Sequence, residues 1–298
     1  GTVMATVGAG LIEAKVQRRQ APLFEQLSNP SRRGTVNMFW LGQAGFAIRT
    51  ARQLILVDPY LSNALAEKYR DAPFKHTRMM ESPLAPDEPR GVDYIFATHA
   101  HSDHLDPGSI GKIMALNPEC RLVCPKSARG KALERGADPD RIVHLSSLEK
   151  RSLGRFSVEM IPSAHEELAD DGRGNILFAG YIFAIEGIKL YHSGDCVPYD
   201  GLAMLLRERG VNIALLPVNG RDQYRREHGV PGNFTVEEAA ELCVEASIPF
   251  LIPHHFGMFE FNTVPPEEIE LRLRPYRARG LDWRIPSVDE ALTARKRD

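Results

Sequence analysis

The chain has 298 residues, of which 43% are hydrophobic and 26% are charged, and its formal net charge is −2. This composition is typical of a soluble globular protein with one large domain or two ordinary ones. Because the charge is nearly neutral and the lysines and arginines are dispersed, we expect no nucleic-acid partner. No apolar run reaches the roughly 20 residues that span a bilayer, so we expect no membrane partner. The four cysteines show no disulfide-like spacing, which favours a cytoplasmic location.

Residues 11–28 are rich in helix-forming residues but contain a proline. We expect them to form a short amphipathic helix. The predicted organisation is therefore an N-terminal helical segment over residues 1–30, packed on a single domain over residues 31–298. The same segment offers an interface for a homo-oligomer.

Short apolar runs punctuated by glycine and proline predict a meander of strands over residues 36–59. A loop rich in proline and charge follows over residues 63–90, and loops of this length often act as lids or binding elements. Beyond it, strands and helices alternate. Strands are predicted from residue 92 and at residues 121–125, 141–145, 156–163, 177–187, 188–195, 213–218 and 250–255. Helices are predicted at residues 107–117, 127–136, 201–210, 236–246 and 264–280. This alternation predicts an α/β domain.

Two of the predicted helices have specific start signals. Asp106 followed by Pro107 is typical of an N-cap and a first helical residue. Thr235 and Glu238 have the spacing of a capping box. We therefore expect one helix to begin directly after Asp106 and another directly after Thr235.

The segment FATHAHSDHLDP, residues 96–107, places three histidines and two aspartates at the end of a buried strand. Alternate residues of a strand share a face, so His99 and His101 point the same way, and a tight turn can bring Asp103 and His104 to a second nearby point. Imidazole nitrogens and carboxylate oxygens suit zinc and neighbouring transition metals. Two such pairs indicate two metal ions, in preference to a solvated loop with chance histidines.

Further candidate ligands stand at the ends of three other predicted strands: His165, Asp195, and the pair His254 and His255. In α/β proteins the ends of strands converge on one edge of a sheet, where binding sites form. A single histidine after a strand is more often an ordinary surface or core residue. Their joint occurrence favours a shared site.

These residues resemble a known family. The order of the histidines and aspartates, together with FWLGQAGFAIRT, LILVDPYLS, HSGD and IPHHF, is similar to the metallo-β-lactamase-fold hydrolases over residues 36–262. The segments LLPVNGRD, GNFTVEEA and IPHHFGMF are similar to the branch that contains L-ascorbate-6-phosphate lactonase. The resemblance implies an α/β fold with four layers, an αββα sandwich, and a two-metal site between its two sheets.

The resemblance also implies a role for each candidate ligand. One ion would be held by His99, His101 and His165, the other by Asp103, His104 and His255, with Asp195 between them. His255 is preferred to His254 because the family places its ligand two residues after the proline of IP. Asp58, His192 and His254 would contact the ligands instead of the ions, although Asp58 is equally typical of a turn that ends a strand. The expected cofactors are two divalent ions, zinc or manganese, with iron also compatible.

Two divalent ions that share a water molecule lower its pKa from 15.7 toward about 7 and so supply a hydroxide. Catalytic roles fall on His255 and on Asp103, which can accept a hydrogen bond from the nucleophile. The expected function is a metal-dependent hydrolase that opens a lactone of a small polar or phosphorylated substrate. Asn219, Arg221 and His228 would bind this small molecule, although a solvated loop explains these three residues equally well.

Two other functions fit the same ligands. A phosphodiesterase or nuclease would use the same dinuclear site, but a nuclease should carry a basic surface, and a net charge of −2 does not indicate one. A non-catalytic metal-binding scaffold would keep the fold without turnover. The complete set of ligands argues against that scaffold.

Overall fold

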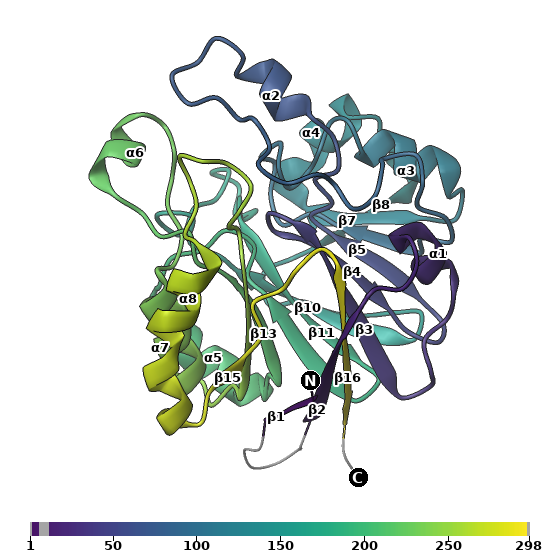
Figure 1. The fold of residues 1–298 in the computed structure, drawn as a ribbon. Coiled ribbons are helices and arrows are strands. Elements are labelled where there is room, and N and C mark those ends of the chain that lie inside the picture. Colours follow the sequence, from purple (N-terminus) through teal and green to yellow (C-terminus); the bar gives the residue numbers. More distant parts are fainter. Residues whose placement is uncertain (1, 6–11, 297–298) are drawn as a thin grey trace.

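The computed structural model describes residues 2–5 and 12–296. Two mixed sheets face each other, and helices lie on both outer sides (Figure 1). The αββα layering predicted from the sequence is confirmed. No helix within the described residues has both the length and the hydropathy that a membrane crossing requires.

The first sheet carries both ends of the described chain. Its spatial order is β1 (Thr2–Ala5), β2 (Ile12–Arg18), β16 (Glu290–Lys296), β3 (Thr35–Gly42), β4 (Gly45–Arg49), β5 (Leu54–Val57), β6 (Tyr94–Phe96), β7 (Arg121–Pro125) and β8 (Ile142–Leu145). The strands from β1 to β5 pair antiparallel in this order, whereas β5 to β8 run parallel.

The second sheet has the spatial order β15 (Asp282–Trp283), β14 (Phe250–His254), β13 (Ile213–Pro217), β12 (Ile188–His192), β11 (Ala179–Ile185), β10 (Phe156–Pro162) and β9 (Lys150–Leu153). Strands β12 to β15 run parallel. Parallel strands bring their carboxyl ends to one edge. Each sheet therefore gathers several strand-ending loops at one end of the sandwich.

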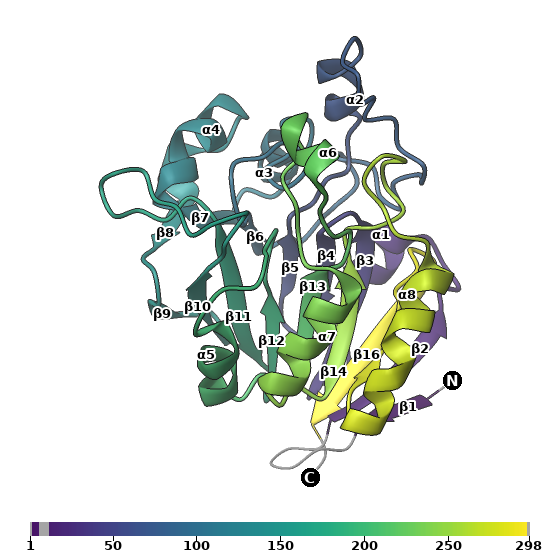
Figure 2. The same ribbon diagram turned by 90° about the vertical axis from the view of Figure 1, so that its left-hand side faces the viewer.

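Helices cover the outer faces of both sheets. Against the first sheet pack α1 (Leu23–Ser28), α3 (Ile110–Leu116) and α4 (Arg129–Glu134). The second sheet is covered by α5 (Leu202–Arg209), α7 (Val236–Glu245) and α8 (Pro266–Leu273) (Figure 2). Two short helices, α2 (Ala64–Lys68) and α6 (Gln223–Glu227), project together from one end of the sandwich. Single turns of 3-10 helix occur at Lys126–Ala128 and Pro139–Arg141, and a longer one at Arg274–Arg279 extends α8.

The strand β5 illustrates why the central strands form. Its four apolar residues are all fully buried. Ile55 and Val57 belong to the core between the sheets, whereas Leu54 and Leu56 pack on the side of α3 and α4. Because side chains alternate along a strand, an unbroken apolar run fits a strand that is covered on both faces.

The helix expected over residues 11–28 is wrong for Ile12–Arg18, which form β2. Ile12 and Ala14 are buried and stand two residues apart, which is the period of a strand, and β2 pairs antiparallel with β16. Only Leu23–Ser28 is helical in this region. The part of the prediction that concerns residues 1 and 6–11 lies outside the described residues, and the division at residue 31 stays a prediction.

The capping box predicted at the start of α7 is confirmed. The Thr235 hydroxyl accepts a hydrogen bond from the Glu238 amide, and the Glu238 carboxylate accepts one from the Thr235 amide at 2.9 Å. These contacts satisfy two amides that a helix start otherwise leaves unpaired.

The helix start predicted directly after Asp106 is wrong. The helix α3 begins at Ile110, three residues later than expected, and Ser109 precedes it. The Asp106 carboxylate instead accepts hydrogen bonds from the Leu61 and Ser62 amides at 3.1 and 3.0 Å. Asp106 therefore ties the histidine-rich loop to the segment that follows β5.

Candidate metal centre

The candidate ligands follow strands of both sheets. The histidine-rich loop comes after β6 in the first sheet. In the second sheet, His165 follows β10, Asp195 follows β12 and His255 follows β14 directly. Segments that are far apart in the chain thus meet at one end of the sandwich.

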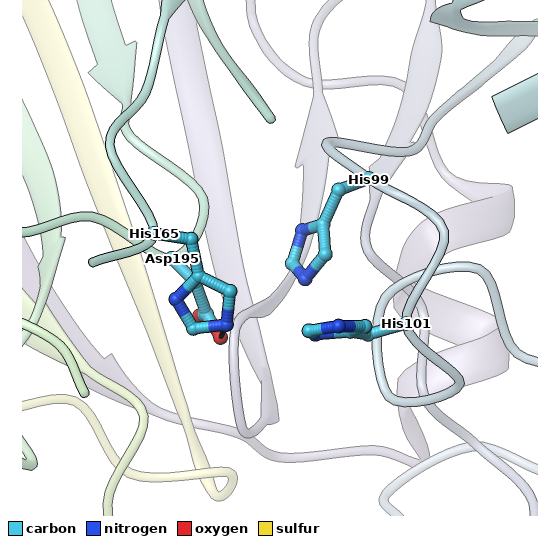
Figure 3. Close-up of side chains that lie close together, drawn as sticks. All are labelled: His99, His101, His165 and Asp195. Atoms are coloured by element: carbon cyan, nitrogen blue, oxygen red, sulfur yellow. Dashed lines mark ion pairs between the residues drawn. The ribbon is translucent and has the colours of Figure 1, made fainter. Parts of the chain in front are cut away.

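The first group of ligands consists of His99, His101, His165 and Asp195. One donor atom from each of them lies within 4.8 Å of all the others. Figure 3 shows the His99 and His101 rings facing His165 and Asp195 across a common space. All but the exposed His101 are buried.

The second group consists of Asp103, His104 and His255, whose donor atoms also lie within 4.8 Å of one another. Asp195 contacts this group too, since its Oδ1 lies 3.3 Å from both His104 Nε2 and His255 Nε2. Its other oxygen, Oδ2, lies 3.6 Å from His165 Nε2 in the first group. The Asp195 carboxylate therefore stands between the two groups.

The spacing of these atoms fits bound cations. A zinc–nitrogen bond is about 2.0–2.1 Å long, so two ligand atoms on one tetrahedral ion lie about 3.4 Å apart. The separations from Asp103 Oδ2 to His104 Nε2 and His255 Nε2 are 3.6 and 3.7 Å. His99 Nε2 and His104 Nε2 are buried without a hydrogen-bond partner among the described residues. Because such a buried orphan costs about 1–3 kcal/mol, a cation accounts for both observations.

The electrostatics of the two groups also suit cations. Burial lowers the pKa of His165 to about 4 and that of His99 well below its usual value, so both rings are neutral and keep a lone pair. Burial also opposes the charged form of His104, but the Asp195 and Asp103 carboxylates outweigh it and raise its pKa, so a cation that binds this ring has to displace a proton. Burial would raise the pKa of both aspartates, but the neighbouring imidazoles lower it. These carboxylates therefore stay ionised at neutral pH.

Asp58 holds the His104 ring from behind. His104 Nδ1 lies 2.6 Å from Asp58 Oδ2, and the Thr98 amide and hydroxyl donate to the same carboxylate at 2.8 and 2.7 Å. An Nδ1–H that donates to a carboxylate leaves the lone pair on Nε2. That is the nitrogen of His104 that faces Asp103 and Asp195.

His192 and His254 lie behind the ligands, in neither group. Their rings stack at a centroid distance of 4.8 Å, and both pack edge-on against Phe46. His192 Nε2 lies 2.8 Å from the Ala44 carbonyl oxygen. The structure thus brings His255 into the centre and packs His254 into the core beside it.

Of the three residues expected to bind substrate, only one lines the pocket in the structure. A pocket of about 500 Å³ opens over the ligands, and His228 lines it. The Arg221 guanidinium is instead paired with Glu238 at 2.6 and 2.7 Å, and Asn219 donates to Asn262 at 2.8 Å. Neither Arg221 nor Asn219 is among the residues that line the pocket.

Sequence reasoning missed two residues that shape the centre. Gln43 Nε2 lies 2.9 Å from Asp103 Oδ2 and 3.1 Å from His255 Nε2. The sequence feature that could have indicated Gln43 is a polar residue between two glycines, in the turn from β3 to β4. Arg135 of the segment after α4 donates to the Ala100 carbonyl at 2.8 Å and so holds the histidine-rich loop. Nothing in the sequence around Arg135 marks this contact.

Comparisons with known proteins identify the family. A family model described as the beta-lactamase superfamily domain matches residues 53–256. A UPF0173 metal-dependent hydrolase from Aeropyrum pernix is 31% identical over 254 residues, which cover 78% of this chain and 88% of the relative. The chain belongs to the UPF0173 metal-dependent hydrolases of the β-lactamase superfamily. The paired histidine and aspartate groups are the candidate metal site of this UPF0173 protein.

Solved structures agree with the fold of the UPF0173 chain. Igni18, described as a novel metallo hydrolase from Ignicoccus hospitalis, has a TM-score of 0.63 at 19% identity and covers 87% of this chain and 98% of its own. A metallo-β-lactamase fold protein from Bacillus subtilis has a TM-score of 0.60 at 12% identity, covering 86% and 98%. At these identities the likeness concerns the fold alone.

Proposed function

We propose that this UPF0173 protein opens a cyclic ester, a lactone, by hydrolysis at a dinuclear metal centre. The observation that carries the proposal is Asp195, whose two carboxylate oxygens face the two groups of ligands. Two divalent ions held there would polarise a water molecule and the carbonyl oxygen of the ester. The set of nitrogen and oxygen ligands is compatible with zinc, manganese or iron.

We expect Asp103 to take the proton of the attacking water. Asp103 lines the pocket, and its lowered pKa keeps it ionised and ready to accept a hydrogen bond. Gln43 donates a hydrogen bond to the Asp103 carboxylate and so fixes its orientation. A general base that is held in place in this way loses little entropy when the substrate arrives.

A lactone is preferred to a phosphodiester for two reasons. The segments around Asn219 and His255 resemble the branch that contains L-ascorbate-6-phosphate lactonase. The pocket of about 500 Å³ suits a small molecule, and the net charge of −2 offers no general attraction for a polyanion. Phosphodiester hydrolysis at the same ligands is the alternative to be tested.

The test combines metal analysis with a substrate panel. We expect purified protein to hold two divalent ions per chain and to hydrolyse simple lactones faster than bis-p-nitrophenyl phosphate. Asp195→Asn should abolish turnover, whereas the matched control Asp87→Asn, at an exposed loop position, should retain it. Turnover of the phosphodiester alone by the metal-loaded protein would refute the lactone proposal.

A further inference from the structure

We infer that the pocket accepts an apolar ring on the substrate, an aryl or alicyclic substituent of the ester, in preference to a phosphate or another anionic group. The inference rests on the proposed function for the ester. Its evidence is separate, because it comes from the part of the pocket that lies beyond the metal ligands.

Six aromatic side chains line this part of the pocket and are called here the aromatic wall: Tyr69, Phe74, His76, His228, Phe259 and Phe261. They come from three separate segments, the loop that contains α2, the loop that contains α6 and the loop after β14. Figures 1 and 2 show α2 and α6 projecting from the same end of the sandwich. The wall therefore exists only in the folded chain.

The rings of the aromatic wall fix one another in place. Phe74 stacks on Phe261 at a centroid distance of 4.7 Å, and His76 packs edge-on against Phe259 and Phe261 at 4.9 and 4.8 Å. Tyr69 stacks on His76 at 4.2 Å. A further ring can add to such an array by the same stacked or edge-on geometry. A preformed wall also avoids the entropy cost of ordering side chains on binding.

The wall itself carries little charge. Burial lowers the pKa of His76, so its ring is neutral at pH 7, and its Nδ1 lies 3.0 Å from the Phe74 carbonyl oxygen. Phe259 is fully buried, whereas Phe74 and Phe261 are half-buried and keep part of their surface in the pocket. Covering exposed aromatic surface with an apolar group is favourable.

The cations that line the pocket are poorly placed to hold an anion. Arg135 donates to backbone carbonyls, and Lys131 is paired with Glu134 at 2.6 Å. Lys68 is exposed, and its ammonium lies 4.8 Å from the centre of the Tyr69 ring. A phosphate in the pocket would lose hydration without a guanidinium fork to replace it. An uncharged ring avoids this cost.

The inference is tested first by comparing three substrates: γ-butyrolactone, a phenyl-substituted γ-butyrolactone and a γ-butyrolactone that carries a phosphate. We expect kcat/KM to be highest for the phenyl compound, by at least about tenfold, the order of magnitude that apolar pocket contacts provide. F261A should lower the ratio of kcat/KM between the phenyl and unsubstituted lactones by about the same factor. The matched control F24A, on α1 and 39% exposed, should leave that ratio as it is.

A binding experiment separates this inference from the proposed function. A phenyl-substituted γ-lactam, which resists hydrolysis, is titrated calorimetrically into the protein as purified, beside a phosphate-bearing lactam. We expect the phenyl compound to bind more tightly, and F261A to weaken its binding by about tenfold or more. F261L keeps apolar bulk without a flat ring, so its affinity for the phenyl lactam should lie between those of wild type and F261A. If F261A does not unfold cooperatively, F261L replaces it in the test.

Each outcome decides one of the two claims. If lactones are hydrolysed but the phenyl group gives no advantage, or if the phosphate compound is preferred, the inference is overturned and the proposed function stands. If no lactone is hydrolysed, the proposed function fails, and the lactam titration alone decides the inference. Equal binding of the phenyl lactam by wild type and F261A would overturn it.

Discussion

At the scale of single residues, Asp58 orients the ring of the candidate ligand His104. Its carboxylate accepts the His104 Nδ1–H and is itself held by Thr98. Its backbone φ of +44° is uncommon for an aspartate and indicates that surrounding contacts hold this conformation. The result is a ring whose Nε2 faces Asp103 and Asp195 and can bind a cation once its proton is displaced.

Replacing Asp58 with Asn should weaken metal binding at the second group by about 10- to 100-fold. The amide has the shape of the carboxylate, but its NH₂ can donate to Nδ1 and so favour the ring tautomer whose Nε2 carries the proton. Competition with a chromophoric chelator measures the affinity. Asp87→Asn is the matched control, and indistinguishable affinities of Asp58→Asn and wild type would disprove the orienting role.

His101→Ala should reduce the metal content from two ions to about one per chain and remove nearly all activity. Because His101 is exposed, its replacement should change the free energy of unfolding of the metal-free protein by only a few tenths of a kcal/mol, apart from the stabilisation lost with the ion. Elemental analysis and turnover on the preferred lactone provide the readouts. His144→Ala, which removes a histidine from β8 outside both groups, should keep both ions. Full turnover by His101→Ala would show that His101 is not a ligand.

At the scale of elements, α7 connects the loop that carries α6 to the second sheet. Glu238 at its third position closes the capping box and also pairs with Arg221 of the loop that carries α6. The predicted role of Arg221 in substrate binding stays a prediction, and in the structure its guanidinium is paired with Glu238. The start of α7 therefore anchors the loop that supplies His228 to the pocket.

Thr235→Ala should lower the free energy of unfolding by about 1 kcal/mol, because the Glu238 amide loses its partner at the helix start. Urea unfolding followed by circular dichroism measures the change. Thr77→Ala, at an exposed loop position, is the matched control and should be neutral. A neutral Thr235→Ala would mean that the box adds nothing to the stability of α7.

The elements that sequence reasoning predicted differ physically from those that it missed. The residues of β5 are apolar on both faces, so the run itself signals a buried strand. The C-terminal strand β16, EALTARK, has charged residues at both ends, and its strand character depends on pairing with β2 and β3. The five-residue helices α2 and α6 are too short to show a helical period.

The same distinction applies to the site. The candidate ligands from His99 to His104 are neighbours in sequence, so their spacing alone predicted a metal site. Gln43 meets Asp103 only because β3, β4 and the histidine-rich loop end at one place. The aromatic wall likewise joins three loops, and no local sequence pattern predicts that Phe74 stacks on Phe261.

At the scale of the whole molecule, the two groups bring ionised carboxylates together with imidazole nitrogens that lack a hydrogen-bond partner among the described residues, at one end of the sandwich. Ions that bind only the folded chain stabilise it, by about 2.7 kcal/mol for each site at a hundredfold excess over Kd. Removing the ions with a chelator should therefore lower the unfolding temperature, and adding zinc or manganese should restore it. Scanning calorimetry tests this.

The variant Asp195→Asn provides the comparison for the chelator experiment. It lacks the shared carboxylate, so its unfolding temperature should respond weakly to chelator, while Asp87→Asn should respond like the wild type. Superimposable curves for wild-type protein with and without chelator would contradict a role of the ions in stability.

The position of β1, β2 and β16 side by side has a further consequence. Ile12 faces Lys296 across the ladder, and these strands reach the end of the sandwich away from α2 and α6 (Figures 1 and 2). A linker that joins Thr2 of β1 to Lys296 of β16 would therefore cross only β2, and a new opening at the exposed segment around Gly172 would break no described strand. We expect such a circular permutant to keep every described strand pairing, so a reporter protein fused at Gly172 would interrupt neither sheet.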